Sequence, residues 1–194
     1  MDGNGRWARK KGHERLFGHN AGVDSVRTAV EYAREKGIRY LSLFAFSEEN
    51  WGRPDEEVSG LMALMAKAVA EERATFAKYD IRFRIIGNRK QLPEDLVVTV
   101  EELEAETLSN SSMDLIIMLS YSGRWDILQA AYRYGEICAN AAREGLPMPS
   151  LDQDSFSCLL STDGIPDPDL IIRTSGEQRI SNYMLWQAAY TEFY

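Results

Sequence analysis

The chain has 194 residues, of which 44% are hydrophobic and 27% charged, so it can bury a substantial core and is neither disordered nor of low complexity. With 22 basic and 30 acidic residues its net charge is −8, which argues against a general nucleic-acid binder. Its two cysteines form no C-x-x-C pair, so neither a disulfide scaffold nor a cysteine-rich zinc site is expected.

Helical and strand patterns alternate along the chain. The glycine-rich residues 2–18 are predicted to be a loop, and Asn20 is predicted to cap a helix that ends near Lys36, just before Gly37. Apolar runs predict strands, and a proline stands where each of two later helices begins. The predicted strands are residues 38–46, 81–86, 113–120, 170–173 and one starting at 192, and the later helices are 54–79, 93–108, 125–143, 152–160 and 182–190.

This order predicts the α/β class, with a mainly parallel β-sheet flanked by helices. No internal repeat and no interdomain linker is visible, so a single domain over residues 1–194 is expected. In such sheets ligands bind at the loops that follow the carboxyl ends of the strands. The loops at 47–53, 120–126 and 173–181 are therefore the candidate site.

Several of these segments have the composition of a phosphate site. In residues 2–7 (DGNGRW) the glycines can expose backbone N–H groups to an anion, and Arg6 offers several donors in one plane. Asp2 can hold a divalent cation that bridges to phosphate. The alternative is that these residues form a plain turn. Arg15 and His19 precede the predicted helix start, where an anion is favoured and where a capping or packing histidine is the alternative.

Two further segments follow strands. Residues 47–54 (SEENWGRP) offer hydroxyl, carboxylate, amide, aromatic and guanidinium groups, with a charged surface loop as the alternative. Residues 173–181 (RTSGEQRIS) place two arginines six positions apart, like a second anion cradle. Glu192 is a candidate metal partner for Asp2, although a lone carboxylate is usually a surface residue. P-loop, dinucleotide and nucleophile-elbow motifs are absent from the sequence, so the residues predict an enzyme with two diphosphate-like ligands and Mg²⁺.

Taken together, five segments resemble the cis-prenyltransferases, closest to the bacterial undecaprenyl diphosphate synthases. They are MDGNGRWA, RLFGHNAG, LSLFAFSEENWGRP, YSGRWDI and IIRTSGEQRISNYMLWQAAYTEFY, in the family's order and spacing. The resemblance implies Mg²⁺-dependent condensation of isopentenyl diphosphate onto an allylic diphosphate such as farnesyl diphosphate, repeated with cis geometry. It also implies a long polyprenyl product, undecaprenyl diphosphate, for the lipid carrier of cell-wall synthesis, and a homodimer with the family's α/β fold.

The resemblance also implies residue roles. Asp2 matches the family's essential aspartate for Mg²⁺ and the allylic diphosphate, Glu192 its second magnesium carboxylate, and Asn50 the residue proposed to help remove a proton. Substrate contacts are matched by Gly3, Asn4, Gly5, Arg6, Trp7, Arg15, His19, Ser47, Glu48, Glu49, Trp51 and Arg53, and the isopentenyl diphosphate site by Arg173, Arg179, Ile180 and Ser181.

The helix at 54–79 matches the wall of the family's product tunnel. Its apolar stripe could line that tunnel or form ordinary core, and the stripe includes Leu61, Met62, Met65 and Val69. The chain departs from the family in lacking its first strand and its C-terminal strand and helix, and in having Ser120 where asparagine is often seen. We therefore expect a trimmed version of a longer protein.

Two other functions are alternatives to a cis-prenyltransferase. A trans-prenyltransferase is disfavoured because its all-helical fold and paired D-D-x-x-D motifs are not seen in the sequence. A non-catalytic partner subunit is the main alternative, and retention of Asp2, Asn50, Arg173, Arg179 and Glu192 favours an enzyme over it. No stretch of about 18 apolar residues and no signal peptide is seen, so a cytoplasmic protein is expected, with transient contact to a membrane surface for product release.

Overall fold

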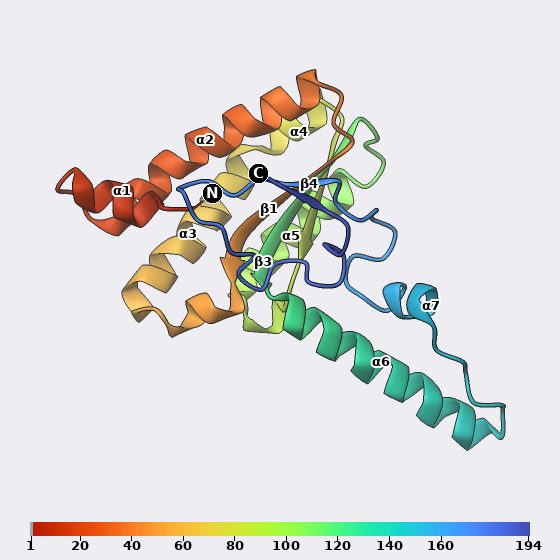
Figure 1. The fold of residues 1–194 in the computed structure, drawn as a ribbon. Coiled ribbons are helices and arrows are strands. Elements are labelled where there is room, and N and C mark those ends of the chain that lie inside the picture. Colours follow the sequence, from red (N-terminus) through yellow and green to blue (C-terminus); the bar gives the residue numbers. More distant parts are fainter. Residues whose placement is uncertain (1) are drawn as a thin grey trace. The chain divides into compact units, whose positions relative to one another are not determined.

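The computed structural model describes residues 2–194 (Figure 1). Its contacts divide the chain into two compact units. The first unit extends to Ser120 and includes residues 173–178, and the second holds residues 121–172 and 179–194.

The first unit contains a three-stranded sheet with the order β1-β3-β2. Strands β2 and β3 pair in parallel, in a register that runs from Ile81 opposite Met113 to Ile86 opposite Met118. The elements of this part of the chain are α1 (Asn4–Lys10), α2 (Arg15–Glu35), β1 (Tyr40–Ser47), the 3₁₀ helix η1 (Glu48–Gly52), α3 (Asp55–Glu71), α4 (Arg73–Lys78), β2 (Ile81–Ile86), η2 (Arg89–Gln91), α5 (Glu94–Glu106) and β3 (Met113–Tyr121).

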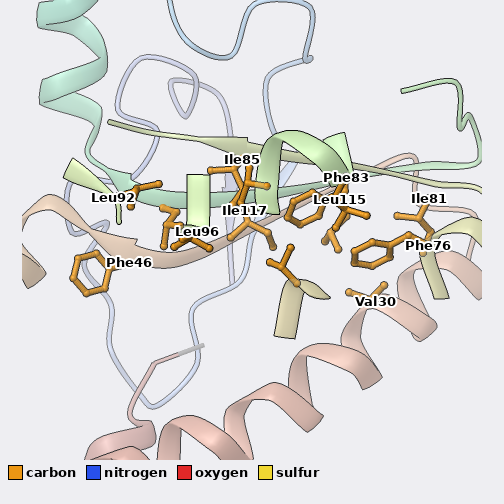
Figure 2. Packing of buried hydrophobic residues seen from close by; sticks show 14 of the residues in the cluster. Val30, Phe46, Phe76, Ile81, Phe83, Ile85, Leu92, Leu96, Leu115 and Ile117 are labelled. Carbon is orange, nitrogen blue, oxygen red and sulfur yellow. The ribbon is translucent and has the colours of Figure 1, made fainter. Parts of the chain in front are cut away.

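The hydrophobic core of this unit lies against one face of the sheet. Alternate residues of β2 and β3, such as Phe83 and Leu115, pack with side chains from α2, α3 and α5. Figure 2 shows part of this layer, with Val30 of α2 and Leu96 of α5 packed together with strand residues such as Phe83 and Ile117. The predicted α/β class with a parallel sheet is confirmed, and the all-helical alternative is excluded. The expectation of a single domain over residues 1–194 stays a prediction.

The predicted loop over residues 2–18 is wrong, because most of it is helical. Helices α1 and α2 pack closely, and the glycines that suggested a loop make the close approach possible. A Cβ on Gly18 would lie 2.1 Å from the backbone oxygen of Asn4, and one on Gly22 would lie 2.5 Å from the Asn4 amide nitrogen. The predicted cap Asn20 therefore lies inside α2, where its amide donates to the Leu16 carbonyl oxygen.

Other helix ends follow ordinary rules. Gly37 has a φ of +71° just after α2, and its N–H and that of Ile38 close the last turn, as predicted for a glycine stop. The single helix predicted for 54–79 is two helices, α3 and α4, on either side of Glu72.

The second unit contains α6 (Gly123–Glu144), α7 (Gln153–Ser157) and the short strands β4 (Leu170–Ile171) and β5 (Glu192–Phe193), which pair in parallel. The helix predicted for 182–190 is wrong: this segment is a series of turns. Ser181, Asn182 and Met184 have φ values of 51°, 61° and 44°, in the left-handed region that a right-handed helix excludes.

A buried carboxylate organises the second unit. Asp126 is 1% exposed and accepts hydrogen bonds from the Ser161 N–H at 2.8 Å, the Ser161 hydroxyl at 2.7 Å, Tyr121 at 3.1 Å, Gln129 at 3.0 Å and Gln187 at 3.1 Å. It thereby ties the start of α6 to two later segments. Among residues 2–194, none of the helices is long and apolar enough to cross a lipid bilayer.

Candidate functional site

The turn before α1 brings Asp2 against the segment that follows β4 in sequence. Arg173 donates to the Asp2 carboxylate at 2.9 Å, and the Asp2 N–H donates to the Thr174 hydroxyl at 3.2 Å. Gly3 has a φ of +82°, and a Cβ there would lie 2.1 Å from the Ser175 hydroxyl oxygen. Only glycine fits this position, because both the backbone angle and the close approach exclude a side chain.

Asp2 is ionised in this setting. Partial burial acts to raise the pKa of Asp2, but hydrogen bonds from Arg173 and the Gly3 N–H, together with the charges of Arg173 and Arg6, outweigh it and hold the pKa below its usual value. The carboxylate is 35% exposed, so a hard cation and solvent can reach it.

Arg6 belongs to the same cluster. Its guanidinium lies 2.7 Å from the Glu177 carboxylate and 3.6 Å from that of Asp2, and it is 55% exposed. Two arginines, Arg6 and Arg173, therefore flank one carboxylate beside a left-handed glycine. Trp7 follows on α1, 41% exposed and stacked on Phe17 with ring centroids 6.0 Å apart.

A second cluster contains three more of the predicted residues. The Arg15 guanidinium donates to both oxygens of Glu57, at 2.8 and 3.2 Å, Arg53 donates to Glu57 at 3.1 Å, and His19 lies 3.8 Å from it. A Cβ added to Gly5 would lie 3.3 Å from a side-chain carbon of Arg15, which places this cluster next to α1. Arg15 Nε is buried without a hydrogen-bond partner among residues 2–194.

Glu57 is not among the site residues that the sequence predicts. It is 11% exposed and joins α2, α3 and the residue after η1. Burial acts to raise the pKa of Glu57, but hydrogen bonds from Arg15 and the charges of Arg15, Arg53 and His19 lower it below its ordinary value. The spacing from Arg53 to Glu57, one helical turn, was the available signal.

His19 is neutral near pH 7. Burial of the imidazole lowers the pKa of His19 below 6.5, the charges of Arg53 and Arg15 lower it further, and Glu57 only partly opposes them. The neutral ring offers one N–H donor rather than a second charge.

Residues 47–53 form the turn after β1. Glu48, Glu49 and Asn50 lie in η1, and the Asn50 amide oxygen accepts the Ser47 N–H at 3.2 Å, which closes the turn. The Trp51 indole N–H donates to the Ser120 hydroxyl at 2.8 Å. The predicted polar loop is therefore an ordered 3₁₀ helix.

The remaining predicted site residues lie in the second unit. Arg179 is exposed, Ile180 accepts the Tyr183 N–H at 3.3 Å, and Ser181 has a φ of 51°. Glu192 lies in β5, exposed, and its N–H donates to the Asp169 carbonyl oxygen at 3.0 Å. The structure thus gathers Asp2, Arg6 and Arg173 into one cluster and Arg15, His19 and Arg53 into an adjoining one, while the pairing of Asp2 with Glu192 and of Arg173 with Arg179 stays a prediction.

The apolar stripe of α3 belongs largely to the core. Met62 is 5% exposed and Val69 4% exposed, and both lie in the main core cluster of the first unit, with Leu61 and Met65 packed against it. The ordinary-core interpretation therefore holds for these two buried residues, and a role in lining a tunnel stays a prediction.

Comparisons with known proteins agree with this geometry. The sequence matches, over residues 1–194, the family described as "Putative undecaprenyl diphosphate synthase". It is 49% identical over 193 residues to an isoprenyl transferase of Chlorobaculum tepidum, covering 99% of this chain and 71% of that protein. It is 44% identical over 194 residues to a ditrans,polycis-undecaprenyl-diphosphate synthase of Haemophilus influenzae that is named as (2E,6E)-farnesyl-diphosphate specific, covering 100% and 80% of the two chains.

A solved structure of a prenyl diphosphate synthase is also similar to this chain. The crystal structure of lavandulyl diphosphate synthase from Lavandula x intermedia, in complex with dimethylallyl diphosphate, is similar to this chain with a TM-score of 0.92 and 34% sequence identity. The match covers 100% of this chain and 83% of that one.

Proposed function

The chain belongs to the undecaprenyl diphosphate synthase family and is a prenyltransferase, and we propose that it condenses isopentenyl diphosphate onto an allylic diphosphate, repeatedly and with cis geometry. We take farnesyl diphosphate as the allylic substrate and undecaprenyl diphosphate, for the cell-wall lipid carrier, as the product. The name of the Haemophilus influenzae relative supports that choice, while the plant structure with dimethylallyl diphosphate makes a shorter allylic substrate the second candidate.

The observation that carries the proposal is the cluster at the start of α1. Arg6 and Arg173 stand on either side of Asp2, beside the exposed turn at Gly3. In the reaction the allylic carbon–oxygen bond breaks, and its electron pair leaves with the diphosphate. The positively charged Arg6 guanidinium would stabilise this leaving group where its negative charge develops, while Arg173, on the other side of Asp2, is assigned to the second diphosphate. Arg15, whose side chain is 40% exposed in the adjoining cluster, is proposed to add a further contact.

The residues at Asp2 fit Mg²⁺. This ion usually takes one or two carboxylates and completes its shell with water and substrate phosphate, rather than sitting in a cage of protein ligands. Asp2 is ionised and partly exposed, and residues 2–194 contain no group of three or more His, Cys, Asp or Glu that would form such a cage. We propose Asp2 as one carboxylate ligand and Glu192 as the other. When bound, Mg²⁺ would neutralise charge on the departing diphosphate.

The second half of the reaction forms the new carbon–carbon bond. The double bond of isopentenyl diphosphate supplies the electron pair to the allylic carbon, and a proton then leaves the carbon beside the new bond. Asn50 is a weak base, and its amide oxygen already accepts the Ser47 N–H. We therefore propose that Asn50 orients the reacting groups and that the departing diphosphate is the final proton acceptor. Isopentenyl diphosphate is assigned to Arg173, Arg179, Ile180 and Ser181.

Two partners belong to the proposal. A homodimer is supported by α6, on which Leu128 and Tyr132 lie one turn apart and are 61% and 77% exposed. Transient contact with a membrane surface during product release is supported by Trp7 and Phe17, exposed aromatic residues with the Lys11 ammonium 4.4 Å from the Trp7 ring. A cytoplasmic location is proposed with them.

The test is direct. The purified chain is incubated with labelled isopentenyl diphosphate and either farnesyl or dimethylallyl diphosphate, with Mg²⁺ or with EDTA, and the products are sized by chromatography. A ladder of long products with farnesyl diphosphate, seen only with Mg²⁺, is expected. If neither allylic substrate is extended in the presence of Mg²⁺, the result would contradict the proposed activity and favour the alternative of a non-catalytic partner subunit.

A further inference from the structure

Ser120, at the end of β3, has an unusual backbone. Its φ is +52°, in the left-handed region that residues with a side chain seldom adopt, and it is 0% exposed. Its carbonyl oxygen accepts the Asn88 N–H at 2.9 Å, which ties the end of β3 to the loop after β2. Such conformations persist only where the surrounding contacts require them, and they gather at functional sites.

The Ser120 hydroxyl makes two hydrogen bonds, each with a side chain. It accepts the Trp51 indole N–H at 2.8 Å and donates to the Gln91 amide oxygen at 2.6 Å. Its single proton goes to Gln91, so the hydroxyl presents a lone pair toward the indole. The backbone angle and the two bonds together hold one hydroxyl between η2 and η1.

Trp51 lies inside the substrate segment 47–53. Its ring packs edge-on against Phe46, with centroids 5.0 Å apart, so the ring and the indole N–H are each held by one neighbour. The preceding residue is Asn50, and the Arg53 N–H donates to the Asn50 carbonyl oxygen at 3.1 Å. A shift of the indole would therefore move the short 3₁₀ turn that presents Asn50 and Arg53.

We propose that Ser120 is a positioning residue for the substrate segment: its hydroxyl, oriented by Gln91, holds the Trp51 indole and through it the η1 turn. This inference rests on the proposed function, because it assigns to residues 47–53 a substrate that needs a fixed geometry. The competing explanation is a buried hydroxyl that serves stability alone.

Three substitutions at position 120 separate these explanations. Ser120→Ala removes the hydroxyl and keeps the backbone strain, while Ser120→Gly removes both. Ser120→Asn supplies an amide donor and acceptor on a residue that tolerates the left-handed region. The matched control is Thr107→Val, because the Thr107 hydroxyl is also buried, accepting the Phe83 N–H at 3.1 Å and donating to the Leu103 carbonyl oxygen at 2.8 Å, with none of these partners in the substrate segment.

The first measurements are the Kd for farnesyl diphosphate by calorimetry and kcat/KM for the first condensation. Ser120→Ala and Ser120→Gly should each weaken binding and lower kcat/KM about tenfold, since both hydrogen bonds of the hydroxyl are lost, including the one that holds the Trp51 indole. Ser120→Asn should restore most of both, and Thr107→Val should change neither. Wild-type values in the alanine and glycine variants, or an equal loss in Thr107→Val, would overturn the positioning role.

The second measurement reads the hydrogen bond without substrate. Urea unfolding of wild type, Ser120→Ala, Trp51→Phe and the double variant gives a double-mutant cycle for the hydrogen bond. Each substitution should lower the free energy of unfolding less in the presence of the other than it does alone. Additive costs would overturn the inference. A chain that binds farnesyl diphosphate but transfers no prenyl group would contradict the proposed function. In that case the Kd values of the Ser120 variants and the urea double-mutant cycle would still decide the role of Ser120. Absence of binding to farnesyl diphosphate and to dimethylallyl diphosphate alike would overturn both.

Discussion

Glu57 is the centre of the cationic cluster, and replacing it with glutamine tests that cluster most directly. Glu57→Gln keeps the shape of the side chain and removes the charge that Arg15, Arg53 and His19 share. The amide oxygen can still accept one hydrogen bond, but the amide nitrogen now faces donors. The variant should therefore fold and be less stable.

The size of the loss follows from the contacts. A hydrogen bond to a charged group contributes about 1.5–3 kcal/mol when buried. Glu57 is 11% exposed, but Arg15 and Arg53 are 40% and 33% exposed, so solvent weakens both interactions. Because one acceptor remains in the glutamine, we expect the free energy of unfolding to fall by about 1–2 kcal/mol. The melting temperature should fall by roughly 2–8 °C for a chain of this length.

The assay is urea unfolding at pH 7.5, with Glu56→Gln as the matched control. Glu56 and Glu57 both lie in the first turn of α3, so the two substitutions remove the same charge from the same helix terminus. Glu56 is exposed, and its replacement should cost less. Equal losses in the two variants would refute the conclusion that Glu57 holds the cluster.

The pH dependence adds a second check. Because the folded state lowers the pKa of Glu57 below 4.5, its contribution is present above that pH and is lost as the pH falls through the lowered value. The difference between wild type and Glu57→Gln should therefore shrink in acid. The pKa of His19 is also lowered in the folded state, so its contribution is present above about pH 6.5 and declines as the pH falls. Since Glu57 acts to raise the pKa of His19, an NMR titration of Glu57→Gln should show it lower still.

Four other substitutions probe the rest of the molecule. Asp2→Ala should leave the circular dichroism spectrum unchanged and lower kcat by roughly 10²–10⁴-fold, because a group acting on the leaving diphosphate is lost; near-normal turnover at saturating Mg²⁺ would argue against the assignment. Arg179→Ala should raise the KM for isopentenyl diphosphate more than that for the allylic substrate, and equal effects would count against two separate diphosphate sites. Val69→Phe should cost about 1–3 kcal/mol by overpacking the core, and a shorter product ladder without loss of stability would instead favour a tunnel wall. Asp126→Ala should lower the free energy of unfolding by about 2–4 kcal/mol, since buried donors lose their acceptor, and a wild-type urea midpoint would disprove this role.

The sequence by itself determined the parts of this protein that depend on local pattern. Runs such as Ile81–Ile86 and Met113–Tyr121 are strands because their apolar residues suit a sheet that is buried on its faces. Gly37 ends α2 because the residue after the helix adopts the left-handed conformation, which glycine reaches without steric strain since it has no side chain. The family, and with it the residues at 2–7, 47–53 and 173–181, was also readable, since long motifs in a fixed order are specific.

Tertiary contacts decided the rest. Gly18 looks like a loop residue in sequence, but it lies in α2, where the close approach of the Asn4 backbone explains it. Glu57 could not be distinguished from Glu56 until Arg15 and His19 of α2 and Arg53, directly after η1, came to lie around it. Ser120 reads as one more residue of an apolar strand, and its role depends on Gln91 and Trp51, which are 29 and 69 positions away. Hydrogen bonds and ion pairs between distant segments form only when the chain has folded, so no local pattern records them.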